Sequence, residues 1–292
     1  MNIKILVVLT AVLLSNSYIK AQTVNIGVRG GIAIPNIVAG NDNPLSKGYS
    51  SSFAGGGGIF TELKLNKKFL LRFGVEYSMQ GGKRNGIQGM STNQMITDVV
   101  TQMGQGVSEE LLATISTVTQ NFPPVFYADV KNRAKFDYLM IPVALQTDIF
   151  QRGQWKIYVN AGPFVSFLMS ATQESEGFSQ LYASEDKSRT VYQLIPEAVQ
   201  PALEQALPAL ANVLKNGTEF GSSAITGEIR PVNVGVHGNI GVSYLYCNRH
   251  RFFVEVGGNY GLLRIQKNEA NGSNRIGSAA LMLGYAFSLT KN

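Results

Sequence analysis

Segments in which apolar and polar residues alternate recur along the whole 292-residue chain, and they constrain its fold more than any other feature. The clearest is 233-NVGVHGNIGVSYLYC-247, where every second residue from Val234 to Tyr246 is apolar except Gly238. Asn233 and His237 occupy the other parity. Because successive side chains of a β-strand point to opposite faces, a period of two predicts a strand with one apolar and one polar face.

About eight such segments are present, and most are ten or more residues long, the length that a tilted strand needs to cross a bilayer. They are residues 24–34, 59–65, 69–79, 139–149, 155–167, 233–247, 252–262 and 275–289.

The connections between these segments alternate in length. Short connections fall at 66–68, 151–154 and 248–251, whereas the others span 35–52, 81–135, 170–230 and 266–274. Short periplasmic turns and long external loops are typical of outer-membrane barrels, and a soluble β-sandwich has no reason for the alternation. The pattern predicts an eight-stranded antiparallel transmembrane up-and-down β-barrel with both chain ends on the turn side.

Composition narrows the protein class further. Only 15% of residues are charged, yet no apolar run of about 20 residues follows the first two dozen, which argues against a helical membrane protein. A single cysteine, Cys247, excludes an internal disulfide framework. The net charge of +6 comes from scattered Lys and Arg, so we expect no nucleic-acid partner.

The first residues, MNIKILVVLTAVLLSNSYIKAQ, have the layout of a signal peptide: an early Lys, a short apolar segment and small residues at Ala21. We predict a signal peptide over 1–21 with cleavage after Ala21, and a barrel domain over 22–292. A buried N-terminal helix is the alternative. Export together with the strand pattern predicts a location in the bacterial outer membrane, with outer-membrane lipid as a partner.

The apolar parity should face the lipid and the polar parity the lumen, because unpaired polar groups are costly in hydrocarbon. Buried opposite charges should pair, and we expect Arg72 to lie near Glu76 and Glu62 near Lys64. An eight-stranded barrel is only wide enough to be filled by side chains, which argues against a general pore. The predicted lumen polar network consists of Arg29, Glu62, Lys64, Arg72, Glu76, Asp148, Lys156, His237 and Glu255.

Two further residue sets have predicted positions. Aromatic residues near strand ends are expected in girdles at the membrane surfaces; they are Trp155, Tyr158, Tyr244, Tyr246, Phe252 and Tyr285. Inward glycines favour tight packing, with a narrow cavity as the alternative; they are Gly27, Gly31, Gly56, Gly58, Gly235, Gly241, Gly257 and Gly261.

Two long loops carry helical insertions, over about 82–134 and 170–230. Helices are predicted at 92–106, 108–122 and 191–217, the last interrupted by Pro196, Pro201 and Pro208. Their apolar residues predict either a docking surface outside the cell, for an envelope protein or a small apolar ligand, or mutual packing that caps the barrel. The candidate docking residues are Met95, Met103, Leu111, Leu112, Leu203, Leu207, Leu210 and Leu214.

Chemical sites have weak sequence support. Neither His237 nor His250 belongs to a metal-binding spacing, so no metal or other cofactor is expected. The glycine run 55–58 lacks the Lys of a phosphate loop. A hydrolase would need a base beside a nucleophile, and only His237 with Ser243 or Ser166 offers one. We expect no enzyme and no catalytic residue.

Three motifs resemble a known family. The first strand NIGVRGGIAIPNI, the phrase DYLMIPVAL at 137–145 and the last strand LGYAFSL are similar to Bacteroidetes outer-membrane β-barrel proteins, the PorT-like or porin-like family. The KAQ cleavage context is similar too. The resemblance covers the strands and omits both large loops. It implies the barrel fold and the outer membrane, and the family's founding member is implicated in secretion and gliding machinery.

Three functions are compatible with the sequence. The first is a non-enzymatic structural or binding module with a filled lumen, as part of an envelope or secretion assembly. The second is a narrow channel or transporter for small or apolar ligands. The third is a barrel hydrolase acting on lipid or peptide.

Overall fold

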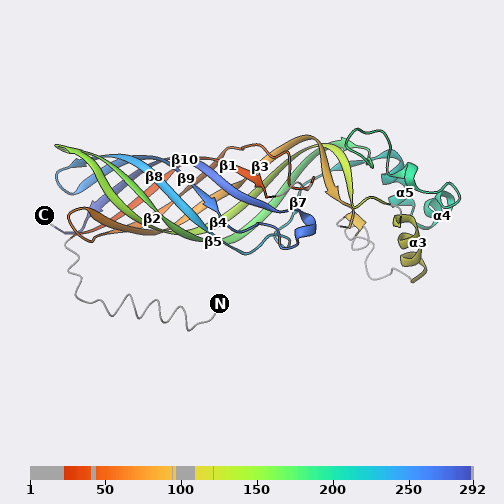
Figure 1. Cartoon of the computed structure of the whole chain (residues 1–292), viewed down its shortest axis with the longest axis horizontal. Coiled ribbons are helices and arrows are strands. Elements are labelled where there is room, and N and C mark those ends of the chain that lie inside the picture. The colour runs from red at the N-terminus through yellow and green to blue at the C-terminus, as the bar shows by residue number, and fades with distance from the viewer. Residues whose placement is uncertain (1–22, 41–43, 94, 97–108, 121, 291–292) are drawn as a thin grey trace.

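Eight long antiparallel strands form a closed ring. The computed structural model describes residues 23–40, 44–93, 95–96, 109–120 and 122–290. Pairing of β1 with β10 and of β4 with β5 closes the ring, so no long strand has a free edge along the barrel. This confirms the predicted eight-stranded barrel (Figure 1). The strands are β1 (Val24–Ala39), β2 (Ala54–Lys64), β3 (Phe69–Ser91), β4 (Val125–Arg152), β5 (Trp155–Ser179), β8 (Val232–Tyr246), β9 (His250–Gly261) and β10 (Asn274–Ser288).

Tight turns join the strands at one end of the barrel. Only Gly153 and Gln154 separate β4 from β5. Between β8 and β9, Cys247 and Asn248 have φ angles of 47° and 56°, the left-handed pair that a type I′ turn requires. Cys247 is thus an exposed turn residue. The start of β1 pairs with the end of β10 at this same end, as an even strand number requires.

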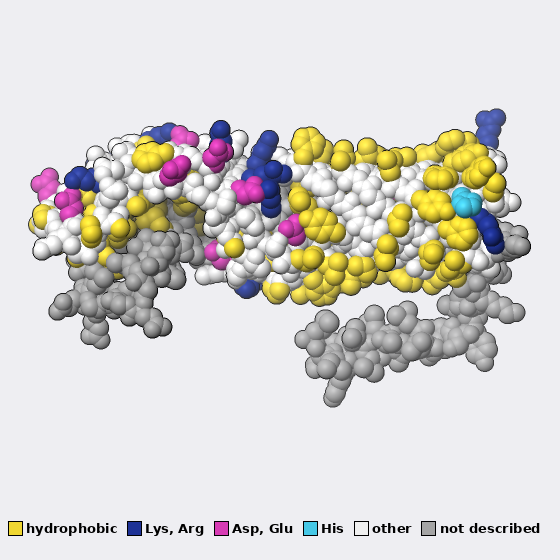
Figure 2. All heavy atoms as spheres, turned by 180° about the vertical axis from the view of Figure 1, so that it is seen from behind, with side chains coloured by type: hydrophobic (Ala, Val, Ile, Leu, Met, Phe, Trp, Pro, Cys, Tyr) yellow, Lys and Arg dark blue, Asp and Glu magenta, His cyan; other side chains and the backbone are white. Residues whose placement is uncertain are grey.

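The outward parity is apolar over the barrel half of the molecule. On β1, for example, Ile26, Val28 and Ile32 are exposed while Arg29 is buried. In Figure 2 yellow side chains lie along the edges and near the turn end of this half, with uncharged white surface between them, and the charged side chains gather over the other half and at the turn end. The apolar band is the lipid-facing surface of a membrane barrel.

Aromatic residues mark the turn end of this band. The Trp155 and Tyr244 rings lie 5.0 Å apart, and those of Phe252 and Tyr285 5.3 Å apart. Tyr158 does not join them: its side chain is fully buried in the lumen. It belongs to the inward parity of β5, and this parity, rather than its nearness to the strand end, decides its position.

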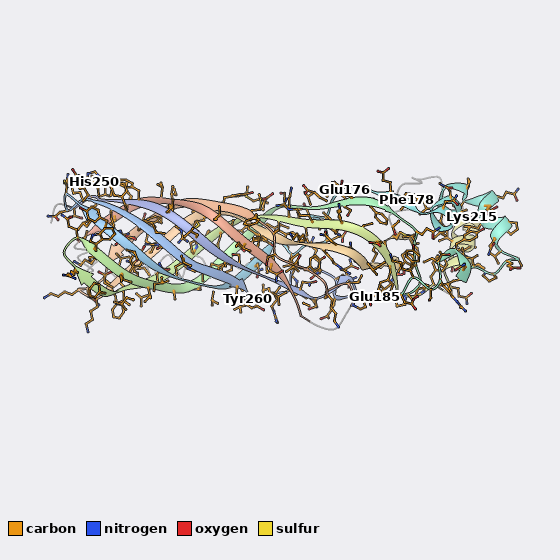
Figure 3. All side chains as sticks on the ribbon, turned by 90° about the horizontal axis from the view of Figure 1, so that it is seen from above. Glu176, Phe178, Glu185, Lys215, His250 and Tyr260 are labelled. Carbon is orange, nitrogen blue, oxygen red and sulfur yellow. The ribbon has the colours of Figure 1, made fainter. Side chains whose placement is uncertain are left out.

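Strands β3, β4 and β5 continue well beyond the apolar band as a stalk. They have 23, 28 and 25 residues. The predicted insertions at 82–134 and 170–230 were therefore too long, because residues up to Ser91, from Val125 and up to Ser179 are strand. Figure 3 shows Tyr260 where the barrel meets the stalk, with Glu176 and Phe178 farther along it.

The polarity of β4 reverses where the stalk begins. On the side of this point that leads to the turn end of the barrel, the outward residues of β4 are apolar, as at Leu139 and Val143. Beyond it the outward positions from Asp137 back to Asp129 are all charged, and the inward ones, including Phe136 and Phe126, are buried. The reversal is the expected change from a lipid solvent to water.

A helical head ends the stalk. It contains α3 (Glu109–Thr119), a 3₁₀ turn η2 (Tyr192–Leu194), α4 (Gln200–Ala206), α5 (Pro208–Asn216) and the short strand β6 (Thr218–Phe220). Pro201 and Pro208 lie in the first turns of α4 and α5, where a missing N–H costs nothing. Gly217, with φ of 93°, follows the last turn of α5. The predicted helix at 92–106 falls largely outside the described residues.

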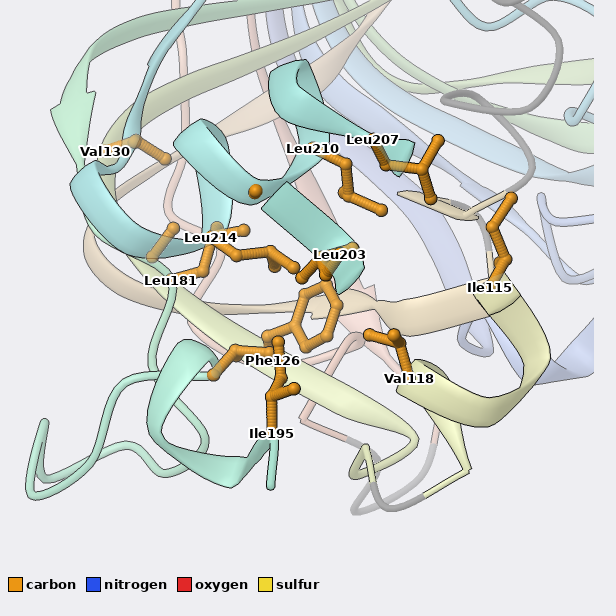
Figure 4. Close-up of a cluster of buried hydrophobic side chains, with 13 residues drawn as sticks. Ile115, Val118, Phe126, Val130, Leu181, Ile195, Leu203, Leu207, Leu210 and Leu214 are labelled. Carbon is orange, nitrogen blue, oxygen red and sulfur yellow. The ribbon is translucent and has the colours of Figure 1, made fainter. Parts of the chain in front are cut away.

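The head has its own hydrophobic core, built from its described α-helices, the loops beside them and the N-terminal end of β4 (Figure 4). Its fully or nearly fully buried members are Ile115, Val118, Phe126, Ala128, Val130, Leu181, Val191, Ile195, Leu203, Leu207, Leu210, Ala211 and Leu214.

A second apolar cluster, the outer plug, fills the barrel where it meets the stalk. Inward residues of the strands, such as Phe136 and Tyr138 on β4, pack there against Ile229 and Ile265 from the external loops. The short strand β7 (Ser223–Ala224) and the 3₁₀ turn η3 (Glu269–Asn271) belong to these loops. Among the described residues, no helix has both the length and the apolarity needed to cross a membrane.

Candidate functional site

Glu255 is the centre of a buried charged cluster in the barrel. The cluster comprises Arg29, Glu62, Arg72, Glu76, Arg251 and Glu255, which come from β1, β2, β3 and β9. The fully buried Glu255 carboxylate accepts hydrogen bonds from two arginines, from the Tyr158 hydroxyl at 2.8 Å and from the Asn160 amide at 3.1 Å.

Arg29 joins β1 to the opposite side of the cluster. Its Nε and Nη2 donate to the two oxygens of Glu76 at 2.7 and 2.9 Å, a bidentate pair. Its Nη1 donates to Oε2 of Glu255 at 2.8 Å. One guanidinium thus bridges two carboxylates from strands that are not neighbours in the sheet.

Arg72 and Arg251 share the carboxylate of Glu62. The Arg72 Nη2 lies 2.9 Å from Oε1 of Glu62, and Arg251 pairs with the same oxygen. Arg72 also donates to Oε1 of Glu255 at 2.5 Å and to Gln146 at 3.0 Å. The expected Arg72–Glu76 and Glu62–Lys64 pairs are wrong: each carboxylate bonds instead to arginines that the barrel brings in from other strands.

The cluster is electrically balanced. Three arginines face three glutamates, with side-chain exposures of 12% for Arg251 and 6% or less for the other five residues. Charges removed from water persist only when paired and hydrogen-bonded, and loss of one partner from a buried pair costs about 3–5 kcal/mol. The arrangement suits a closed cross-brace rather than a water-filled passage.

Aromatic rings enclose the Arg72 guanidinium. Its carbon lies 4.7 Å from the Phe60 ring centre, 5.3 Å from that of Phe253 and 5.9 Å from that of Tyr158. Phe60 and Phe253 meet edge to face at 5.8 Å. Cation–π contact and exclusion of water both favour a buried arginine here.

Glycines make room for these rings. A Cβ added at Gly284 would lie 2.1 Å from Cζ of Phe253, and one at Gly241 would lie 2.4 Å from Cζ of Tyr158. Each glycine sits on the strand beside its ring, facing inward. The tight-packing interpretation of the inward glycines thus has a concrete basis at these positions, because only glycine leaves space for a ring across a narrow lumen.

Other residues of the predicted lumen network lie away from the cluster. Lys64, Asp148 and Lys156 line a vestibule at the turn end of the barrel, where Lys156 and Asp148 pair at 2.6 Å. Arg251 was missed because the sequence assigned it to a turn. Its place two positions before Phe253 and four before Glu255, on the same parity, was the signal that could have placed it inward.

His237 has a local structural setting. The β4–β5 ladder lacks the pairs expected at Val143 and Ala144, since Pro163 has no N–H to give. His237 lies opposite Gly162 in the β5–β8 register. A Cβ at Gly162 would lie 1.9 Å from the Val143 carbonyl oxygen. The His237 side chain is buried, and its Nε2 has no hydrogen-bond partner among the described residues.

The remaining space in the lumen is divided. The turn-end vestibule measures ≈ 410 Å³, and Arg251 of the charged cluster contributes to its lining. On the other side, Arg29 and Glu76 help to line a chamber of only ≈ 50 Å³. A space of ≈ 10 Å³ follows beside Tyr138, next to the outer plug. The charged cluster and the outer plug therefore close the lumen at two levels.

The candidate docking residues lie mainly inside the head. Leu203, Leu207, Leu210 and Leu214 are 0–7% exposed and form its core. They do not present a docking surface, because each turns towards α3, β4 and the other helices; mutual packing is what the structure shows. Met95 packs against the same core. Met103 and the side chains of Leu111 and Leu112 fall outside the described residues.

Neither of the two serines considered as nucleophiles from the sequence lies beside His237. Ser243 lies six residues away on the same strand, roughly 20 Å at the usual rise. Ser166 pairs with Asn233, four residues from His237 and roughly 13 Å along β8. In the described part of the chain, no group of three or more His, Cys, Asp or Glu side chains could hold a metal ion.

Comparison with protein families independently supports the outer-membrane barrel. The family model "Outer membrane protein beta-barrel domain" matches residues 20–266. The chain belongs to this family. With the closed ring and the lipid-facing band, this places the protein in the bacterial outer membrane, as the sequence predicted. No curated protein matches the sequence.

The solved structures that match this chain include other outer-membrane proteins. Neisserial surface protein A shares 12% identity over 90% of this chain and 96% of its own, with a TM-score of 0.34. Ail of Yersinia pestis shares 10% identity over 90% of this chain and 98% of its own, with a TM-score of 0.33. The outer membrane protease OmpT of Escherichia coli shares 8% identity over 92% of this chain and 98% of its own, with a TM-score of 0.39.

Proposed function

We propose that this outer-membrane barrel is a non-conducting, non-enzymatic support that holds its helical head away from the outer leaflet for contact with another envelope component. The stalk is the observation that carries the proposal. From Asp137 to Val125, β4 runs for roughly 40 Å beyond the apolar band, and the head follows. A barrel that only sealed or conducted would not need this extension.

The closed lumen supports the non-conducting part of the proposal. An ion entering from the turn end would meet the charged cluster, in which every carboxylate already binds an arginine. Beyond it lie a chamber of ≈ 50 Å³ and the outer plug. The channel alternative would need both barriers to move. The hydrolase alternative is not favoured, because Ser166 and Ser243, the two serines that the sequence offered as its nucleophile, both lie away from His237.

The PorT-like motifs support a finer proposal. Their resemblance implies membership of a Bacteroidetes branch and a role in a secretion or envelope assembly. In that setting the head is the natural contact element, because external loops carry the variable parts of barrel proteins. Phe178, 66% exposed on β5 next to the head, is the most accessible large aromatic side chain there. Exposed aromatic residues are enriched in protein interfaces.

A head-less variant tests this function. Gln88 and Ala128 are cross-strand partners, so a two-residue turn can join them, and a short linker can join Gly177 to Gly221. In native membranes, chemical cross-linking should capture a partner with the full chain and lose it with this variant. Phe178→Ala should weaken capture while exposed Gln205→Ala should not. An unchanged set of cross-linked proteins in the head-less variant would contradict the proposal.

A further inference from the structure

The vestibule at the turn end of the barrel is strongly basic. Its ≈ 410 Å³ are bordered by six cationic side chains and one acidic side chain, Asp148. The cations are Lys64, Lys67, Lys68, Lys156, Arg249 and Arg251.

The acidic groups near the vestibule are already engaged. Asp148 pairs with Lys156 at 2.6 Å. Glu62, at the inner end, binds Arg72 and Arg251 and also accepts from the Asn25 amide at 3.0 Å. These carboxylates therefore cannot neutralise the lysines of the β2–β3 turn, and the vestibule keeps an excess of positive charge.

The cations converge from opposite sides of the ring. The β2–β3 turn supplies Lys67 and Lys68, and the β8–β9 turn supplies Arg249, with two strands between the turns on either side. The wall between them is a low-dielectric barrel in lipid, which focuses the field into the opening. Lysine ammonium groups bind phosphate as point charges, and arginine adds directed donors.

We propose that this vestibule binds a phosphate-bearing anion with two or more negative charges. The proposal goes beyond the role of the head, because the site lies at the opposite end of the molecule. Two sources could supply the chemistry: a soluble phosphate compound, or the headgroup of a phospholipid with two phosphates, such as cardiolipin, in the surrounding leaflet. A single-charged carboxylate would leave most of the cations without a partner.

The lysines can be removed without disturbing the turn. Its shape is held by Asn66, whose side-chain oxygen accepts from the backbone N–H groups of Lys68 and Phe69 at 2.8 Å each. The double variant Lys67→Gln/Lys68→Gln should therefore keep the fold. The matched control is Lys83→Gln/Lys131→Gln, which removes the same charge from exposed stalk positions.

Isothermal titration with sodium tripolyphosphate tests the site, using the full chain in phosphatidylcholine nanodiscs. We expect saturable binding that weakens with salt, an affinity at least about tenfold lower in the vestibule variant, and wild-type affinity in the stalk control. Absence of binding, or equal loss in both variants, would overturn the proposal.

Repeating the titration in nanodiscs that contain cardiolipin, whose headgroup carries two phosphates, separates the two sources. Loss of tripolyphosphate binding in the wild-type protein would identify the lipid headgroup as the occupant. Retained binding would identify a soluble phosphate compound.

Discussion

The carboxylate of Glu255 on β9 accepts a hydrogen bond from the guanidinium of Arg72 on β3, across the barrel interior, with 2.5 Å between Nη1 and Oε1. The two strands lie on different parts of the ring, separated by β2, β1 and β10. The pair therefore braces the barrel from wall to wall, which hydrogen bonds between neighbouring strands cannot do.

Removing Glu255 should destabilise the barrel strongly. In Glu255→Leu, Arg29 and Arg72 each lose an acceptor while remaining buried, so we expect a loss of about 3–5 kcal/mol in the free energy of unfolding. Urea unfolding in phospholipid vesicles, followed by tryptophan fluorescence, measures this. The double variant Arg72→Met/Glu255→Leu should recover part of the loss. A Glu255→Leu protein as stable as the wild type would show that the brace carries no energy.

The glycine beneath Phe253 should tolerate no side chain. Gly284→Ala places a Cβ 2.1 Å from the ring, so it should cost about 1–3 kcal/mol, and Phe253→Leu in the same chain should restore much of this. Gly238→Ala is the control, since its nearest neighbour would be at 3.6 Å. The same unfolding measurement applies. If Gly284→Ala and Gly238→Ala lower the free energy of unfolding equally, packing against the Phe253 ring is not the reason for the loss.

The head core should unfold separately from the barrel. Leu203 is fully buried on α4, and Leu203→Ala should cost about 2–5 kcal/mol within the head. Limited proteolysis should then cut the head of this variant faster than the wild-type head. The barrel should still migrate differently on gels before and after heating, as a folded barrel does. The control is Gln205→Ala, which changes an exposed residue of the same helix. The protease should cut its head at the wild-type rate. Unaltered cleavage of Leu203→Ala would contradict the burial of this residue.

Glu204 on α4 should titrate at lower pH than an ordinary glutamate. Hydrogen bonds from Lys215 at 2.8 Å and from the Tyr192 hydroxyl at 2.9 Å hold the pKa of this exposed carboxyl below its usual value. Because the folded pKa is depressed, its contribution to head stability is present above the unfolded pKa and is lost as the pH falls through the folded pKa.

Carbon-13 NMR of the Glu204 carboxyl in detergent micelles measures this pKa. Lys215→Met should raise it towards the ordinary value near 4.3. Lys187→Met, which removes another exposed lysine that pairs with Asp129, should leave it unchanged. If the pKa of Glu204 is the same in the wild-type protein and in Lys215→Met, the Glu204–Lys215 pair does not form in solution.

The membrane-spanning strands could be predicted from the sequence because a single lipid solvent imposes one rule on every outward residue. The stalk was missed because this rule reverses at Asp137. In VFYADVKNRAKFD the period of two continues, with Phe126, Val130 and Phe136 now on the inward parity. A search for alternation without regard to which parity is apolar would have extended β4 correctly.

The inward residues could be predicted, but their partners could not. Strand parity places Arg72, Glu76 and Glu255 in the lumen, yet partner choice depends on the stagger of the strands around the ring. Neighbours along one strand, such as Glu62 and Lys64, were the only pairs visible in the sequence. The arginines instead cross a lumen narrow enough for one guanidinium to reach two walls.

Planar-bilayer conductance of the purified full chain tests the closed barrel most directly. The charged cluster and the outer plug predict no steady ionic current in 1 M KCl, since a water-filled path has to cross both. A steady single-channel current in the wild-type protein, reproducible between preparations, would contradict the closed lumen and with it the proposed role as a support for the head.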